Sequence, residues 1–128
     1  MQFRNLQVDR DDALAIVTLA RPDRLNALDL ALIESLSSTA QAISADPAVR
    51  AVLLRAAGRA FCAGADLVGT DPREGAMTEA EPEARAEAVG RHLRERFNPM
   101  IAAWRRLRVP VVVAVQGVAA GAGASLAL

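Results

Sequence analysis

The 128-residue chain contains no lysine, a single cysteine and a single histidine. All 15 of its basic residues are arginine, which excludes mechanisms that need a lysine, such as Schiff-base catalysis or a P-loop phosphate site. A lone cysteine, Cys62, cannot form an intrachain disulfide or a cysteine-rich zinc site, and it suits a reducing compartment. We therefore expect no disulfide framework and no metal site.

Charge of one sign and aromatic residues are also scarce. The 15 basic and 15 acidic residues give a net charge of zero, and aromatic residues make up 3% of the chain. Electrostatic attraction and base stacking are the main sources of nucleic-acid affinity, so nucleic acid is an unlikely partner. The longest apolar runs, at 109–115 and 118–128, fall short of the roughly 20 residues that span a bilayer. Because no secretory signal precedes them either, we expect a cytoplasmic protein without a membrane span.

The first half of the chain carries clear secondary-structure patterns. Residues 3–8 and 13–19 contain β-branched residues and flank a charged run at 9–12, which predicts an antiparallel hairpin. Asp29 precedes apolar residues at helical spacing. This pattern predicts an amphipathic helix with Asp29 as its N-cap that stops before Asp46.

Residues 49–55 are apolar on both faces, which is typical of a strand buried in a parallel sheet. A hairpin strand, a helix and a buried strand in this order predict a right-handed crossover unit. The sequence therefore predicts an α/β fold.

The second half begins with a segment that lacks an apolar period. Residues 69–83 are rich in glycine, proline and acids, which predicts a mobile loop. A helical pattern then covers residues 84–107, where Asn98 and Pro99 predict a point at which the helix restarts or kinks.

The last 18 residues of the chain (111–128) combine a strand pattern with an apolar helix pattern. Residues 111–115 predict a second buried strand, and residues 122–128 predict the first turns of a helix. A helix of about eight residues is unstable without a partner. We therefore expect the domain to continue beyond residue 128.

Two strands run into turns of small residues, at 49–67 and at 109–128. Glycine and alanine let a ligand approach the backbone, and amides at the start of a following helix point toward negative charge. A single glycine-rich turn could equally belong to a dinucleotide site or allow tight packing, although the spacing and the remaining length do not fit a Rossmann fingerprint. Two such turns on neighbouring parallel strands could aim two N–H groups at one oxygen, which is the geometry of an oxyanion hole.

The segments RPDRLNALDLAL, AGRAFCAGADL and AVQGVAAGAGASLAL carry a family resemblance. In order and spacing they resemble the signatures of the enoyl-CoA hydratase/isomerase (crotonase) superfamily, over residues 13–128. Residues 97–128 look most like the ring-epoxide phenylacetyl-CoA isomerase branch of phenylacetate catabolism. The resemblance implies a crotonase-like spiral of ββα units, incomplete at its C-terminus, with residues 1–128 as the N-terminal part of an acyl-CoA-binding domain.

The resemblance also implies a set of site residues. The thioester carbonyl of an acyl-CoA or enoyl-CoA would sit between the backbone amides of Ala65 and Ala122. CoA is part of the substrate, so no separate cofactor is expected. The residues implied in substrate binding are Arg24, Leu25, Ala27, Ala63, Asp66, Leu67 and Gly121. Arg24 would contact a phosphate, whereas the residues themselves favour a structural role for Asp66, either as a turn cap or in a pair with an arginine.

The chain departs from the hydratase pattern at Ser125. Hydratases of the family carry a catalytic glutamate at this position, and a serine hydroxyl without a histidine partner cannot replace it as a base. We therefore expect enolate stabilisation with isomerisation favoured over hydration. The resemblance also implies a homotrimer or hexamer if the domain is complete. The alternatives are a truncated, catalytically silent fragment with at most weak CoA binding, and an interaction module that docks a partner through exposed apolar surface.

Overall fold

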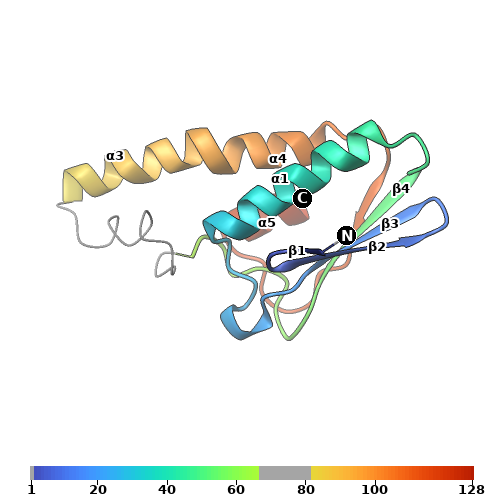
Figure 1. Ribbon diagram of the computed structural model, residues 1–128. Coiled ribbons are helices and arrows are strands. Elements are labelled where there is room, and N and C mark those ends of the chain that lie inside the picture. The colour runs from blue at the N-terminus through green and yellow to red at the C-terminus, as the bar shows by residue number, and fades with distance from the viewer. Residues whose placement is uncertain (1, 67–81) are drawn as a thin grey trace.

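The computed structural model describes residues 2–66 and 82–128. Its strands form one mixed sheet in the order β1-β2-β3-β4-β5, antiparallel from β1 to β3 and parallel from β3 to β5. Helices α1, α3 and α4 lie on one side of this sheet (Figure 1). The loop expected at 69–83 lies almost entirely outside the described residues, and its last two positions are helical.

The predicted N-terminal hairpin is confirmed, with a different boundary. Strand β2 (Leu6–Asp11) pairs with β3 (Leu14–Leu19), and a short β1 (Gln2–Phe3) precedes them. The charged run was expected to be the turn, but most of it belongs to β2. The chain reverses at Asp12, whose φ of 52° is left-handed, a conformation that aspartate tolerates better than most residues.

Helix α1 (Leu30–Ala45) begins and ends where the sequence predicts. The Asp29 side chain accepts a hydrogen bond from the Leu32 amide at 2.8 Å, so it caps the helix. The helix connects β3 to β4 (Ala51–Ala56), and these two strands are parallel, as the crossover requires. The buried face of α1 contributes apolar side chains to the core, namely Leu32, Ile33, Leu36, Ala40 and Ile43.

Of the two options predicted at Asn98, a restart or a kink of the second long helix, the restart is wrong. Helix α3 (Pro82–His92) passes through a π-helical turn (Leu93–Phe97) into α4 (Asn98–Arg105). Asn98 is helical and donates its amide to the Leu93 carbonyl. The wider turn accommodates Pro99, which lacks an N–H to donate. The indole of Trp104 then donates to the Leu36 carbonyl at 3.1 Å and joins α4 to α1.

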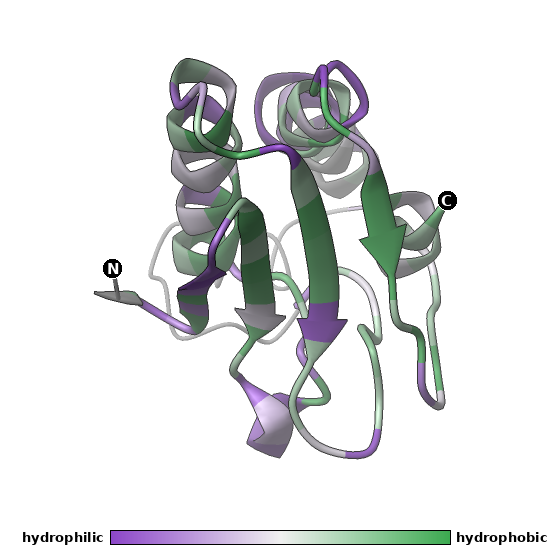
Figure 2. Ribbon diagram, turned by 90° about the vertical axis from the view of Figure 1, so that its right-hand side faces the viewer, coloured by the Kyte–Doolittle hydropathy of each residue, from purple (hydrophilic) through white to green (hydrophobic). Residues whose placement is uncertain are grey.

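Strand β5 (Val111–Val113) is shorter and more exposed than predicted. It occupies an edge of the sheet, and Val112 is 63% exposed. The expectation of a strand buried on both faces is therefore wrong for β5, because its outer edge and one of its faces lack a neighbour among the described residues. Helix α5 (Ala122–Ala127) follows and lies beside β5 (Figure 2).

Candidate functional site

The two small-residue turns lie side by side, as predicted. After β4, the amides of Phe61 and Cys62 both donate to the Val118 carbonyl at 3.1 Å. The Ala120 amide in turn donates to the Cys62 carbonyl at 3.0 Å. These hydrogen bonds extend the parallel β4–β5 pairing beyond the strand ends and bring the two turns to the same edge of the sheet.

Glycine is required where the two backbones touch. Gly64 has a φ of 107°, and a β-carbon there would lie 3.0 Å from the Ala120 carbonyl oxygen. At Gly123, a β-carbon would lie 2.4 Å from the Cys62 carbonyl oxygen, which is closer than atoms can approach. The glycines that the sequence places in these turns therefore serve close backbone packing as well as turn geometry.

The amides of Ala65 and Ala122 are available at this contact. Ala122 is the first residue of α5, where a helix leaves its N–H groups unpaired. Within residues 2–66 and 82–128, neither amide donates a hydrogen bond. Ala65 is exposed and Ala122 is half-buried. The arrangement can therefore present two backbone donors to a ligand.

The turn after β3 joins the same site. It contains the short 3-10 helix Pro22–Arg24, and the Leu25 carbonyl accepts a hydrogen bond from the Ala63 amide at 3.0 Å. Hydrogen bonds from the Leu28 amide to the Gly64 carbonyl (2.7 Å) and from the Asp66 amide to the Leu28 carbonyl (3.0 Å) lie on either side of Ala65.

The residues implied in CoA binding are thus adjacent, apart from one that the structure does not describe. Leu25, Ala27 and Ala63 are half-buried, and Gly121 is exposed in the neighbouring turn. Leu67 lies outside the described residues.

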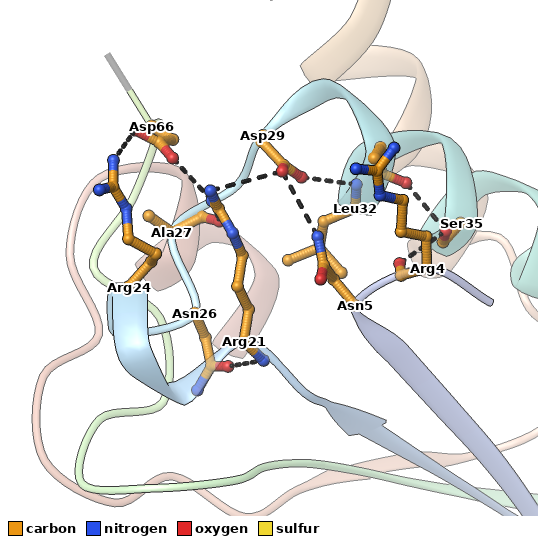
Figure 3. Close-up of polar contacts among 11 residues, drawn as sticks. Arg4, Asn5, Arg21, Arg24, Asn26, Ala27, Asp29, Leu32, Ser35 and Asp66 are labelled. Carbon is orange, nitrogen blue, oxygen red and sulfur yellow. Dashed lines mark hydrogen bonds and ion pairs between the residues drawn. The ribbon is translucent and has the colours of Figure 1, made fainter. Parts of the chain in front are cut away.

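A cluster of charged side chains forms around Asp66, the residue that follows Ala65 (Figure 3). The Arg21 guanidinium is 2.7 Å from the Asp66 carboxylate and 3.5 Å from the Asp29 carboxylate, and it donates to the Ala27 carbonyl at 2.9 Å. Arg24 contacts Asp66 from the solvent side at 3.4 Å. The predicted pairing of Asp66 with an arginine is confirmed.

Residues 14–128 match the family model described as enoyl-CoA hydratase/isomerase. The chain belongs to this family. It is 38% identical over 112 residues to the 1,2-epoxyphenylacetyl-CoA isomerase of Escherichia coli K12, with 88% of this chain and 40% of that protein covered. It is also 38% identical, over its whole length, to a Rhodobacter capsulatus protein named "Probable enoyl-CoA hydratase".

Solved structures of the enoyl-CoA hydratase/isomerase family share the fold. The Mycobacterium smegmatis enoyl-CoA hydratase matches with a TM-score of 0.77 at 34% identity, over 96% of this chain and 44% of that one. The predicted crotonase-like α/β fold is confirmed. The chain spans about 44% of the length of the Rhodobacter relative.

Two polar residues that support the site were not identified from the sequence, although both belong to the RPDRLNALDLAL segment. Arg21 is 7% exposed and Asn26 is fully buried. Asn26 accepts a hydrogen bond from the Arg21 amide and donates to the carbonyls of Ala57 and Ala60, all within 2.9 Å. The available signal was a charged residue at the end of an apolar strand, which requires a carboxylate partner when it is buried.

Cys62 packs beneath the two turns and is fully buried. Burial raises the pKa of its thiol, and a hydrogen bond from the Gly64 backbone offsets this only in part. A neutral, buried thiol is a poor nucleophile, so Cys62 contributes packing between the turns rather than chemistry. The described residues contain no cluster of three metal-ligating side chains, and none of their helices could cross a membrane.

Ser125 lies on the exposed side of α5. Together with Trp104, Val113 and Leu126, it lines a pocket of about 110 Å³ between α4 and β5. Its amide donates to the Gly121 carbonyl at 3.2 Å. The position that the resemblance assigns to a glutamate therefore carries a neutral hydroxyl in this chain.

Proposed function

We propose that this chain binds an acyl-CoA or enoyl-CoA thioester and polarises its carbonyl between the amides of Ala65 and Ala122. The main support is that the two small-residue turns contact each other. Within the described residues, the Ala65 and Ala122 amides at this contact donate no hydrogen bond. Two N–H donors that meet one carbonyl oxygen stabilise the charge of an enolate. Membership of the enoyl-CoA hydratase/isomerase family supports a thioester as the ligand.

The rest of CoA would lie along the turn after β3. Leu25, Ala27 and Ala63 are half-buried and would contact the pantetheine chain. The Arg24 side chain is 43% exposed, and its guanidinium suits a phosphate group. Asp66 is buried against Arg21, so we assign it a structural contribution to this surface rather than direct contact with CoA.

Isomerisation is the reaction class that we favour over hydration. Enolate chemistry needs a general base. Neither Ser125 nor the ion-paired Asp66 suits that role, so hydration by paired glutamates does not fit these residues. The similarity to a relative named for isomerase activity supports this choice.

The second candidate is a catalytically silent chain that binds CoA weakly at most. The hydroxyl at Ser125 favours it, because it leaves no carboxylate at that position of α5. Assembly into trimers or hexamers stays a prediction.

Replacing single backbone amides with esters tests the oxyanion hole directly. Lactic acid in place of Ala65 or Ala122 removes one N–H and keeps the methyl side chain. We expect each ester to weaken binding of butyryl-CoA about tenfold, the value of one lost hydrogen bond. The infrared frequency of a ¹³C-labelled thioester carbonyl should shift down on binding to the unmodified chain and shift less in each ester.

Ala31 provides a matched control. It is an alanine near the start of α1, and its amide likewise donates no hydrogen bond within the described part of the chain. An ester at Ala31 should leave affinity and carbonyl frequency unchanged. Equal behaviour of all three esters would overturn the oxyanion hole, and an unmodified chain without affinity for butyryl-CoA would support the silent alternative.

A further inference from the structure

We infer that Arg21 is a positioning residue that holds the Ala65 amide in place through Asp66. The inference rests on the proposed role of Ala65 and extends it to a side chain that touches no substrate. Asp66 directly follows Ala65, so a force on the Asp66 carboxylate acts on the peptide units next to the amide donor.

The contacts of Arg21 connect three segments that surround the site (Figure 3). One guanidinium nitrogen is 2.7 Å from Asp66 Oδ2 and donates to the Ala27 carbonyl at 2.9 Å. The other is 3.5 Å from Asp29 Oδ2, in the residue that caps α1. Arg21 therefore ties the end of the first small-residue turn to the turn after β3 and to the start of a core helix.

Burial makes this tie strong. The side chains of Arg21 and Asp66 are 8% and 5% exposed. A buried guanidinium that loses a carboxylate leaves a charge uncompensated at low dielectric, so the pair resists separation. Lysine would keep the charge, but its single ammonium group cannot reproduce the planar fork that meets separate acceptors.

Arg21 and Arg24 divide two tasks between them. Arg24 also contacts Asp66, but at 3.4 Å and with a side chain that is 43% exposed. A contact of this kind contributes little and is easily exchanged. Arg24 can therefore leave Asp66 for a phosphate group, while Arg21 keeps Asp66 and the adjacent amide in position.

Amide hydrogen exchange measures, without any ligand, how strongly Arg21 opposes local opening of the first turn. The amides of Leu28 and Asp66 are hydrogen-bonded on either side of Ala65, whereas the Ala120 amide is hydrogen-bonded in the second turn. In Arg21→Lys, we expect exchange at Leu28 and Asp66 to become about tenfold faster, since the ammonium group cannot reproduce the fork of hydrogen-bonding contacts that opposes local opening. Exchange at Ala120 should stay within about twofold of the wild type, because that turn is held by other contacts.

The carbonyl frequency of bound ¹³C-labelled butyryl-CoA separates positioning from affinity. We expect Arg21→Lys to lose most of the downward shift while its Kd rises no more than about threefold. Arg24→Gln should show the opposite split, with a Kd about tenfold higher and an unchanged shift. Arg10→Lys, in the exposed Arg10–Asp46 pair, is the control that should change neither quantity.

The outcomes decide the two proposals separately. Wild-type exchange at Leu28 and Asp66 in Arg21→Lys would overturn the positioning role. Faster exchange in a protein that binds no butyryl-CoA would overturn the proposed function but support the hold of Arg21 on the turn. If Arg21→Lys does not fold, Asp66→Asn decides by the same readouts, because it removes the charge of the partner and keeps its size; unchanged exchange at Leu28 in that variant would overturn the inference.

Discussion

The turn at residues 57–66 and the turn at residues 114–121 each lead to an alanine amide, but different interactions hold them. Buried polar side chains, Arg21 and Asn26, anchor the first turn. The second, which lies beside the exposed edge of the sheet, is held by backbone hydrogen bonds and close packing against the first turn at Gly123, and by Gln116, whose side-chain amide donates to the carbonyls of Ala56 (2.7 Å) and Gly58 (3.1 Å). Buried side-chain hydrogen bonds specify the first turn, whereas the hydrogen bonds of Gln116 are more exposed and the packing of the second turn also requires the absence of a side chain at Gly123.

The largest expected effect comes from removing the buried side-chain amide of Asn26, which anchors the first turn. Asn26→Ala should lower the free energy of unfolding by about 3 kcal/mol, because buried backbone groups lose their partners. Asn5→Ala is the control, since Asn5 has a similar left-handed φ, 63° against 53°, but within the described part of the chain its side chain makes a single long hydrogen bond, of 3.4 Å to Asp29. Urea denaturation should show a much smaller loss for Asn5→Ala. Equal losses would assign the effect to the backbone conformation.

A methyl group at Gly123 tests the packing of the second turn. Gly123→Ala would place a β-carbon 2.4 Å from the Cys62 carbonyl oxygen, so we expect a destabilisation of about 2 kcal/mol from overpacking. At Gly90 in α3, the nearest atom to an added β-carbon is the flexible end of Arg94, at 3.4 Å. Gly90→Ala should therefore stabilise the chain by about 0.5–1 kcal/mol. A neutral Gly123→Ala in thermal or urea melts would show that the turns are not closely packed.

The smallest effect on stability is expected at the exposed edge beside the second turn. Val112 is 63% exposed on β5. Val112→Lys should change the free energy of unfolding by less than about 0.5 kcal/mol and lower the binding of an apolar fluorescent dye. Ala114→Lys adds the same charge at another exposed position and removes less apolar surface. Equal dye binding by the two variants would mean that Val112 is not part of the apolar surface.

Prediction from the sequence succeeded for features set by local pattern and failed for features set by packing. The hairpin, the Asp29 cap, the crossover and the contact of the two turns were all predicted correctly, since each follows from short-range pattern or strand order. The helix does not restart at Asn98, which continues it after a π-helical turn, and the prediction of a buried strand failed at β5, which is exposed. Both depend on what the rest of the chain packs against these segments.

Arg21 shows the difference between what the sequence determines and what the tertiary structure determines. The sequence alone determined which segments turn, where α1 begins, and which small residues could let two backbones meet, because caps, periodicity and glycine act over a few residues. Only the tertiary structure decided that Arg21 is buried between Asp29 and Asp66. The reason is that the low dielectric and the exclusion of water that make this pairing strong exist only once distant segments have packed around it.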